Sequence, residues 1–348
     1  MDFHDGISRY GAGIVQGFKD NNIPITLLIK DKRQLKMLPS DMPYLLVNDP
    51  LSFKELFLAK KLNKLGAEMV ITPFQIIGTW GRKYKLIVTL HDTIYYLHPK
   101  PPENVTGLAR VIWRLFHLVK WPQRFLLNNA DKVATVSNYS KANIGQLNLT
   151  KREIVVIYNA PSLDPSQAHR SNELTKNIVY MGAFMPYKNV EVLIKGMAYL
   201  PHDFTLHLLS KCLDGRRAEL SKLIESGVKV DFHNGVSDEE YIKLLQGAYC
   251  LASASKEEGF GLPIIEAQMI GTPVVCSDMT IFHEVAADGA LFFDYNSPQQ
   301  FADQVKKLDN PEFVSNLVEK GKRQAEKFSW KKSAMTLYEV CEKLVNNK

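Results

Sequence analysis

The sequence has 348 residues, of which 45% are hydrophobic and 23% are charged, which is typical of a globular protein, and its length predicts two domains. The four cysteines are scattered and form no CxxC pair, so neither a disulfide framework nor a structural zinc site is indicated. No apolar run approaches the roughly 18 residues of a membrane-spanning helix, and the N-terminus does not resemble a signal peptide, so we expect a cytoplasmic protein.

The net charge of +6 is distributed unevenly along the chain. Residues 1–175 carry 23 Lys and Arg against 14 Asp and Glu, whereas residues 176–348 carry 20 against 23. A basic first half indicates an anionic partner. Because no nucleic-acid motif appears, we expect a membrane surface rather than a nucleic acid.

Short apolar strand candidates alternate with helical patterns, which predicts parallel sheets built from βα units. A polar segment with Pro and Ser, residues 160–176, separates two sets of six strands and is the expected interdomain linker. Two helical patterns, 311–328 and 330–347, close the chain. The strands are expected at 25–30, 44–47, 68–72, 85–90, 132–137 and 154–159, and then at 177–182, 204–210, 228–232, 249–254, 272–277 and 290–294.

The first motif is the segment GISRYGAGIVQG (6–17), in which Gly11, Gly13 and Gly17 have the spacing GxGxxxG. This spacing resembles a dinucleotide fingerprint, so an NAD-dependent oxidoreductase is a distant alternative. Such a fingerprint needs a strand directly before it, and only five residues precede Gly6. We interpret the segment as a glycine loop that runs into a helix. Either the chain starts further upstream or the first sheet has lost a strand.

The segment LIVTLHDTIYYLHP (86–99) places His91 and Asp92 at the carboxyl end of a predicted strand, where α/β folds bind their ligands. A histidine there could polarise a substrate hydroxyl group, although a lone histidine is more often structural. In TVSNYSKANI (135–144), Ser137 is expected to cap the following helix.

The segment YMGAFMPYKNVEVLIKGM (180–197) runs from a strand through a glycine to a Lys-Asn pair that opens a helix. Lys188 suits the neutralisation of a phosphate as a point charge, or it is a solvated lysine at a helix start. Further on, DFHNGVSDEEY (231–241) is a strand followed by a loop, with Ser237 or Asp238 as a helix cap.

The most informative segment is EEGFGLPIIEA (257–267), a passage from strand through loop to helix. Gly259 and Gly261 allow the backbone to approach a ligand closely, and Pro263 suits the first turn of a helix. The amides from Phe260 to Ile264 would then form a diphosphate site at the helix N-terminus. Two carboxylates, Glu258 and Glu266, make sense there if each faces a hydroxyl-rich group. The alternative is a glycine turn before an ordinary core helix, with both glutamates solvated.

This segment resembles the signature of the retaining glycosyltransferases of family 4, which adopt the GT-B fold. In that signature, two glutamates separated by seven residues flank a GFGLP core. The resemblance implies that Glu258 contacts the transferred sugar and Glu266 the ribose, with Gly259, Phe260, Gly261 and Leu262 around the donor. It places His91 beside the transferred sugar, with Asp92 next to it.

Further matches extend over nearly the whole chain in family order. They imply that the glycine loop, Gly6, Ile7, Ser8 and Arg9, touches the acceptor or the donor phosphates, and that Lys188 holds the leaving diphosphate. The base is expected near Asn234 and Val236. One departure is that Ala183 and Tyr187 stand where many relatives have an arginine. The second positive group is therefore expected from Lys211, from Arg9 or from helix amides alone.

The expected architecture is α/β, with two Rossmann-like domains facing each other across a cleft. Residues 1–160 would bind the acceptor and residues 177–329 the nucleotide sugar, with the final helix, 330–347, packed back on the first domain. The FSW junction before that helix also resembles family 4.

The predicted reaction moves a hexose from a nucleoside-diphosphate sugar to a glycan or lipid-linked glycan, without a metal or other cofactor. GDP-mannose is favoured, because the HD, SNYSK and GFGLP spellings look like bacterial mannosyltransferases of surface-polysaccharide assembly. UDP-glucose, UDP-galactose and dTDP-rhamnose remain open as donors. The alternatives are a non-catalytic sugar-nucleotide-binding protein and a GT-B-fold epimerase.

The segment GLARVIWRLFHLVKWPQRFLL (107–127) sets basic side chains at intervals of three or four, with Trp113, Trp121 and Phe125 nearby. Pro122 is expected to divide the helix. Such a surface suits the anionic inner face of a cell membrane, where a lipid-linked acceptor would lie. A core helix with a solvated charged face is an equally good interpretation. The basic residues are Arg110, Arg114, His117, Lys120 and Arg124.

Overall fold

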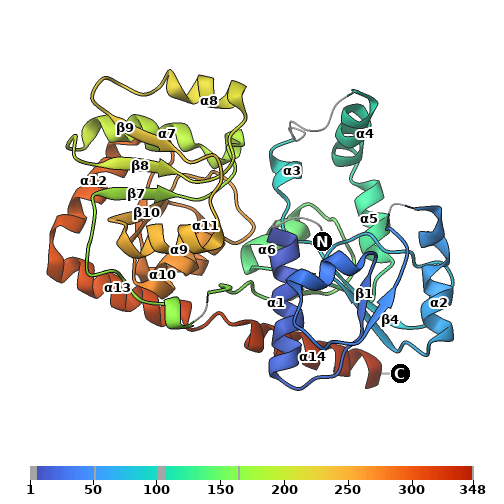
Figure 1. Cartoon of the computed structure of the whole chain (residues 1–348). Coiled ribbons are helices and arrows are strands. Elements are labelled where there is room, and N and C mark those ends of the chain that lie inside the picture. Colours follow the sequence, from blue (N-terminus) through green and yellow to red (C-terminus); the bar gives the residue numbers. More distant parts are fainter. Residues whose placement is uncertain (1–5, 51, 100–106, 164, 347–348) are drawn as a thin grey trace. The chain divides into compact units, whose positions relative to one another are not determined.

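The structure, a computed structural model, describes residues 6–50, 52–99, 107–163 and 165–346 (Figure 1). The chain forms two compact units. Unit 1 consists of Met1–Ala160 together with Phe328–Lys348, and unit 2 is Pro161–Lys327. The chain therefore leaves unit 1 and returns to it at the end.

The strands of unit 1 form two separate parallel sheets. Leu86, Ile87 and Val88 in the middle of the larger sheet are fully buried, which explains their unbroken apolar run. Each of the six strands expected in the first half is present. The smaller sheet pairs β1 (Leu27–Ile29) with β2 (Tyr44–Leu46), and the larger has the order β3 (Met69–Thr72), β4 (Lys85–Thr89), β5 (Lys132–Thr135), β6 (Ile154–Val156).

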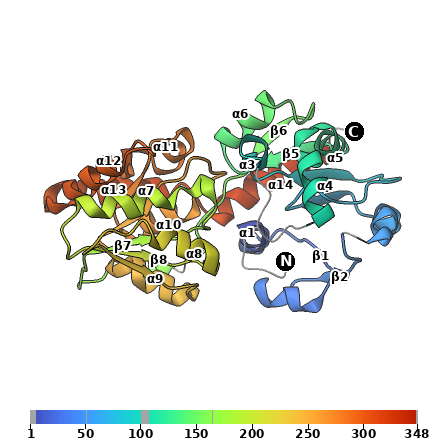
Figure 2. The same cartoon turned by 90° about the horizontal axis from the view of Figure 1, so that it is seen from above.

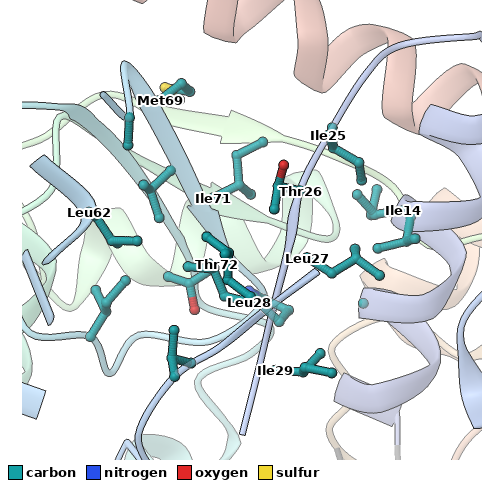
Figure 3. Close-up of a pocket in the computed structure, with 18 of the residues that line it drawn as sticks. Ile14, Ile25, Thr26, Leu27, Leu28, Ile29, Leu62, Met69, Ile71 and Thr72 are labelled. Carbon is teal, nitrogen blue, oxygen red and sulfur yellow. The ribbon is translucent and has the colours of Figure 1, made fainter. Parts of the chain in front are cut away.

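A cavity of about 630 Å³ lies between the two sheets of unit 1 (Figure 3). Leu27 and Ile29 of β1, Ile71 and Thr72 of β3, and Ile14 line it among other mostly apolar residues. Within the described residues, β1 and β3 each pair with one strand only, β2 and β4 respectively. The two sheets of unit 1 are thus separated between β1 and β3.

The helices of unit 1 correct one expectation. Gly6 to Arg9 do not form a loop before a helix, because the helix begins at Gly6 and these residues are its first turn. The division at Pro122 is confirmed, since one helix ends at Leu118 and the next begins at Trp121. The helices are α1 (Gly6–Asp20), α2 (Leu58–Lys64), α3 (Ile94–Leu97), α4 (Gly107–Leu118), α5 (Trp121–Asn128), α6 (Asn138–Gln146) and α14 (Trp330–Asn346).

Gly13 and Gly17 of α1 allow this helix to pack closely against α14 (Figures 1 and 2). A Cβ atom at Gly13 would lie 2.1 Å from Cε2 of the Trp330 indole, and one at Gly17 would lie 2.1 Å from the Trp330 carbonyl oxygen. Asn21 Nδ2 donates to the Lys331 carbonyl oxygen at 2.8 Å. Two of the three glycines of the GxGxxxG spacing, Gly13 and Gly17, therefore serve a close contact between helices.

Unit 2 contains one six-stranded parallel sheet of order β12-β11-β10-β7-β8-β9. In its register, Leu251 lies between Val179 of β7 and Val274 of β11, and all three are buried. All six strands expected in the second half are present. They are β7 (Asn177–Tyr180), β8 (Thr205–Leu208), β9 (Lys229–Phe232), β10 (Cys250–Ser253), β11 (Val274–Ser277) and β12 (Leu291–Phe293).

The segment before β7 is fastened to unit 2. Ser171 N donates to the Gln246 carbonyl oxygen at 2.9 Å, and Thr175 N donates to the Gly247 carbonyl oxygen at 3.0 Å.

In residues 6–346, apart from positions 51, 100–106 and 164, no helix is long and apolar enough to span a membrane. The helices of unit 2 are α7 (Val190–Gly196), α8 (Asp214–Ser221), α9 (Asp238–Gly247), α10 (Leu262–Ile270), α11 (Thr280–Ala286), α12 (Pro298–Lys306) and α13 (Pro311–Ala325).

The contact between α1 and α14 gives a stability prediction. Gly13→Ala and Gly17→Ala should each lower the melting temperature, since overpacking a tight contact costs about 1–3 kcal/mol. Gly145→Ala in α6 is the matched control, because a Cβ there meets nothing within 4 Å. It should be neutral or stabilising, since Ala loses less backbone entropy than Gly in a helix. Thermal unfolding checks this, and equal shifts in all three variants would contradict the packing role.

Candidate active site

Lys188 and Glu258 meet where the strand order of unit 2 reverses. From β7 the chain proceeds to β8 and β9 on one side of the sheet and then returns to β10 on the other side of β7. Open α/β sheets bind ligands outside the carboxyl ends of their strands at such a switch point. Lys188 lies in the short 3-10 helix η4 (Pro186–Lys188) after β7, and Glu258 lies in the loop after β10.

The two side chains form a shielded ion pair. Lys188 Nζ donates to Glu258 Oε1 at 2.6 Å, and Ser255 Oγ donates to the same oxygen at 2.8 Å. The side chains of Lys188 and Glu258 are 17% and 14% exposed. Hydrogen bonds between charged groups are the strong ones, and shielding from water strengthens them further. A ligand with hydroxyl groups next to a phosphate matches this carboxylate beside an ammonium group.

Asn189 fixes the position of Lys188. Its φ of 55° is left-handed, a conformation that Asn tolerates better than most residues. Its side-chain amide donates to the carbonyl oxygens of Ala254 at 3.1 Å and Tyr295 at 2.7 Å, which follow β10 and β12. In addition, Lys256 N donates to the Tyr187 carbonyl oxygen at 2.7 Å. The loops that carry the ammonium and the carboxylate are thus tied together by main-chain groups.

The turn after β7 is held by a buried phenol. Tyr180 Oη donates to the Ala183 carbonyl oxygen at 2.8 Å, and a Cβ at Gly182 would lie 2.8 Å from the same Oη. Burial, and to a smaller extent the charge of Glu258, raises the pKa of Tyr180 well above its usual range. The phenol therefore stays neutral and remains a donor. Ala183 contributes its carbonyl group to this turn.

The start of α10 has the geometry expected for an anion site. Gly261 adopts φ 106°, and a Cβ there would lie 3.0 Å from the Phe282 ring. Pro263 stands in the first turn, and Leu262 opens the helix. Ile264 N donates to the Gly261 carbonyl oxygen at 3.0 Å. The first amides of a helix lack an acceptor one turn earlier in the chain, which is why helix N-termini bind anions. Gly259 and Phe260, just before, are buried.

Glu266 lies one turn into α10 and is only 4% exposed. Tyr241 Oη of α9 donates to Glu266 Oε2 at 2.8 Å. Such a bond fixes the carboxylate in one orientation, which leaves lone pairs for further donors. The structure does not place Glu266 on a solvated surface, so the interpretation of a solvated helix residue is wrong.

Lys211, Asn234 and Gly235 form the corner between the ends of β8 and β9. Asn234 is left-handed, and its Oδ1 accepts from Cys212 N at 3.1 Å, so its side chain serves the fold of this corner. The Lys211 stem packs on Gly235, where a Cβ would lie 3.0 Å from Lys211 Cγ. Val236 follows, and Ser237 caps α9 by accepting from Glu240 N at 3.1 Å, as predicted.

In unit 1, His91 is held from two sides. Its Nε2 donates to the Pro73 carbonyl oxygen at 2.7 Å, which leaves the lone pair on Nδ1 in the neutral ring. Tyr10 packs edge-on against the ring at 4.8 Å between centroids. Asp92 Oδ1 accepts from Ile94 N at 2.9 Å, which opens α3. Ser137 caps α6 by accepting from Ser140 N at 3.0 Å, as predicted.

The structure separates the four residues of the expected glycine loop. In the first turn of α1, Ser8 is 3% exposed and Ile7 is 41% exposed, while Gly6 has nothing within 4 Å of a Cβ position. Arg9 is half-buried. These residues do not form one surface toward a ligand, because successive positions of a helix point in different directions.

Three residues of the unit 2 site were missed from the sequence: Ser255, Asn189 as a positioning residue, and Tyr241 as the donor to Glu266. Asn189 left a signal, since an Asn between a 3-10 turn and a helix suits a left-handed junction. Ser255 and Tyr241 left none. Among the described residues no group of three or more His, Cys, Asp and Glu side chains suits a metal ion.

Comparison with known proteins shows the family of this chain. Residues 42–164 match the family model Glycosyltransferase Family 4, and residues 164–324 match Glycosyl transferases group 1. The O-antigen chain mannosyltransferase RfbU of Salmonella typhimurium is 30% identical over 253 residues, 69% of either protein. The chain belongs to glycosyltransferase family 4. A second relative of this glycosyltransferase, the O-antigen chain mannosyltransferase B of Escherichia coli, is 30% identical over 269 residues, 72% of this chain and 68% of that protein.

Solved structures confirm the predicted GT-B fold of this glycosyltransferase. HepE of Anabaena, solved in complex with UDP and glucose, has a TM-score of 0.72 and 18% identity, covering 98% of this chain and 97% of its own. Sucrose-phosphate synthase of Thermosynechococcus elongatus has a TM-score of 0.73 and 16% identity, covering 97% and 93%. At these identities the likeness concerns the fold alone.

The junction at Asn189 gives a second prediction. Asn189→Ala should lower the melting temperature more than Asn22→Ala, an exposed position with the same φ of 55°. Both variants carry left-handed strain of about 1–2 kcal/mol, but only Asn189→Ala also leaves two carbonyl groups without their donor. It should also lower turnover, because Lys188 loses its support. Equal melting temperatures with unchanged turnover would remove Asn189 from the site.

Proposed function

We propose that this glycosyltransferase transfers mannose from GDP-mannose to a hydroxyl group of a glycan or lipid-linked glycan, with the anomeric configuration retained. The pairing of Lys188 with Glu258 at the switch point of unit 2 carries the proposal. The relatives that are O-antigen chain mannosyltransferases support mannose as the sugar and a glycan as the acceptor.

The chemistry follows from what a sugar diphosphate presents. Hydroxyl groups lie on one side of its anomeric bond and phosphate charge on the other. Glu258 accepts hydrogen bonds from the sugar hydroxyls, and Lys188 neutralises the charge that develops on the leaving phosphate. The C1–O bond to the diphosphate breaks while C1 bonds to the acceptor oxygen on the same face, and the acceptor proton moves to the leaving phosphate oxygen. This route requires no protein nucleophile.

The rest of the donor would extend along unit 2. The amides that open α10 bind the diphosphate, and Lys211 supplies the second positive charge. Glu266, held by Tyr241, accepts from the ribose hydroxyls. The base lies against main-chain groups from Asn234 to Val236. Positive charge and helix amides can do the work of a divalent cation on a diphosphate, so we propose that the reaction needs no metal.

Unit 1 would then supply the acceptor side. His91 and Asp92, at the carboxyl end of β4, are the proposed contacts to the reacting sugar and acceptor. The bond from Nε2 to Pro73 supports this role, because it fixes the ring and its tautomer. Arg9 is the proposed acceptor contact at the start of α1. A UDP-linked hexose is the second candidate donor, because HepE is known in complex with UDP-glucose.

The donor is tested by thermal shift with GDP, UDP and dTDP. A nucleotide at about 100 times its dissociation constant adds about 2.7 kcal/mol to stability, so GDP should raise the melting temperature most. Turnover with GDP-mannose should survive EDTA. Stabilisation by UDP alone would move the donor to a UDP-hexose. A strict need for Mg²⁺ or Mn²⁺ would contradict the metal-free route.

The roles of the charged residues are tested by paired variants. Lys188→Ala should lower kcat steeply. Lys188→Arg should restore little of it, because the planar guanidinium group of arginine replaces a compact ammonium group. Lys256→Ala, at an exposed position in the neighbouring loop, is the control. Glu258→Ala should mainly lower kcat, whereas Glu266→Ala should mainly weaken nucleotide binding. Tyr241→Phe, which removes the hydroxyl group that donates to Glu266, should weaken nucleotide binding less.

Turnover and nucleotide affinity by calorimetry are the measurements for these variants. One hydrogen bond is worth about 0.5–1.5 kcal/mol, so changes below about threefold in both quantities for both glutamates would refute the assigned roles. Full activity of Lys188→Ala would transfer the phosphate role to Lys211.

A further inference from the structure

The outer face of α4 is a continuous aliphatic stripe. All residues of α4 are described, and none of them is buried. Leu108 is 75% exposed, Ile112 58% and Leu118 78%. Side chains three, four and seven positions apart share one side of a helix, so these residues form a single stripe with their aliphatic neighbours. The stripe consists of Leu108, Val111, Ile112, Leu115, Leu118 and Val119.

The opposite side of α4 is fixed by aromatic contacts. These contacts correct the expectation that His117 belongs to a basic surface. The Trp113 and His117 rings lie 4.0 Å apart between centroids, and Tyr95 of α3 packs on Trp113 at 5.1 Å (α3 and α4 in Figure 1). Burial lowers the pKa of His117, so this residue is not part of a basic surface. Trp113 and His117 therefore orient the helix, and the aliphatic stripe faces outward. A core helix with a solvated charged face is excluded.

The stripe continues onto α5. Trp121 is 67% exposed and Phe125 57%, and their rings stack with centroids 6.0 Å apart. Exposed arginines, Arg114 and Arg124, stand beside these apolar groups. Residues 107–130 include four Lys and Arg and no Asp or Glu. The surface is therefore apolar with a purely basic margin.

The apolar stripe and its basic margin together indicate which kind of partner binds this surface. Exposed apolar patches of this kind mark contact with a protein or a membrane. A second copy would bring one basic margin against another, which is unfavourable, and nothing in the margin offers an acidic counterpart. Anionic lipid headgroups match the margin, and the acyl boundary beneath them matches the aliphatic stripe.

We propose that the aliphatic stripe of α4, with Trp121 and Phe125 of α5, lies in the headgroup boundary of an anionic lipid bilayer. The helix lies parallel to the membrane plane and does not cross it. This proposal deepens the proposed function, because it rests on an acceptor that is lipid-linked. It brings unit 1, the proposed acceptor side, to the surface where such an acceptor is anchored.

The test is flotation of the full chain with vesicles of phosphatidylcholine alone or with 30% phosphatidylglycerol, without donor or acceptor. Binding should require phosphatidylglycerol and weaken at 0.5 M salt, since salt screens exposed charges. The double variant Leu115→Gln and Leu118→Gln should bind at least tenfold more weakly. Its matched control, Phe53→Gln and Leu56→Gln in the 3-10 helix η2 (Phe53–Phe57), removes exposed apolar groups elsewhere in unit 1 and should bind as the parent does.

Arg114→Gln should reduce the salt dependence of binding and leave the melting temperature unchanged. Equal vesicle binding by the Leu115/Leu118 variant and its control would overturn the proposal. It would also be overturned if the chain ignores vesicles and forms a dimer that the Leu115/Leu118 variant dissociates. Affinity for GDP, measured on the same variants, should not change, so failure of the membrane contact and failure of the proposed donor site are separate results.

Discussion

The reversal of strand order between β7 and β10 is the constraint on which the candidate site depends. Two loops that are far apart in the sequence leave neighbouring strands there and diverge to opposite sides of the sheet, which opens room for a ligand between them. The ion pair between Lys188 and Glu258 joins these loops, and Asn189 adds neutral hydrogen bonds to the same junction. Charge and backbone geometry thus maintain one arrangement of the two loops, which is the preorganisation that the proposed transfer would use.

The strands and the site loops were accessible from the sequence because both leave local signals. Apolar runs of four to seven residues located the strands, and the GFGLP core located Glu258 and Glu266. The Lys-Asn pair located Lys188, but its contact with Glu258 spans 70 positions and depends on sheet topology, which no local pattern records. For the same reason Tyr241 gave no signal as the partner of Glu266.

The two failures of sequence interpretation in unit 1 have one cause. Spacing alone does not tell which neighbour a helix face meets. Gly13 and Gly17 of α1 belong to a spacing that resembles a dinucleotide fingerprint, but they serve the approach of Trp330. The segment of α4 has basic residues at intervals of three or four. Its orientation is nevertheless decided by the contact between Tyr95 and Trp113, which leaves the aliphatic side chains facing outward. In both cases the deciding contact lies on another element.

The return of α14 to unit 1 has a consequence for biosynthesis. Asn21 bonds to Lys331 across 310 positions, so the groove on α1 that receives Trp330 stays open while the intervening chain is made. At about 5–20 residues per second on the ribosome, this lasts roughly 15–60 s. Unit 2, whose residues are contiguous, is complete before unit 1. During that interval α1 lacks the helix that covers it, and α14 then completes the unit that began first.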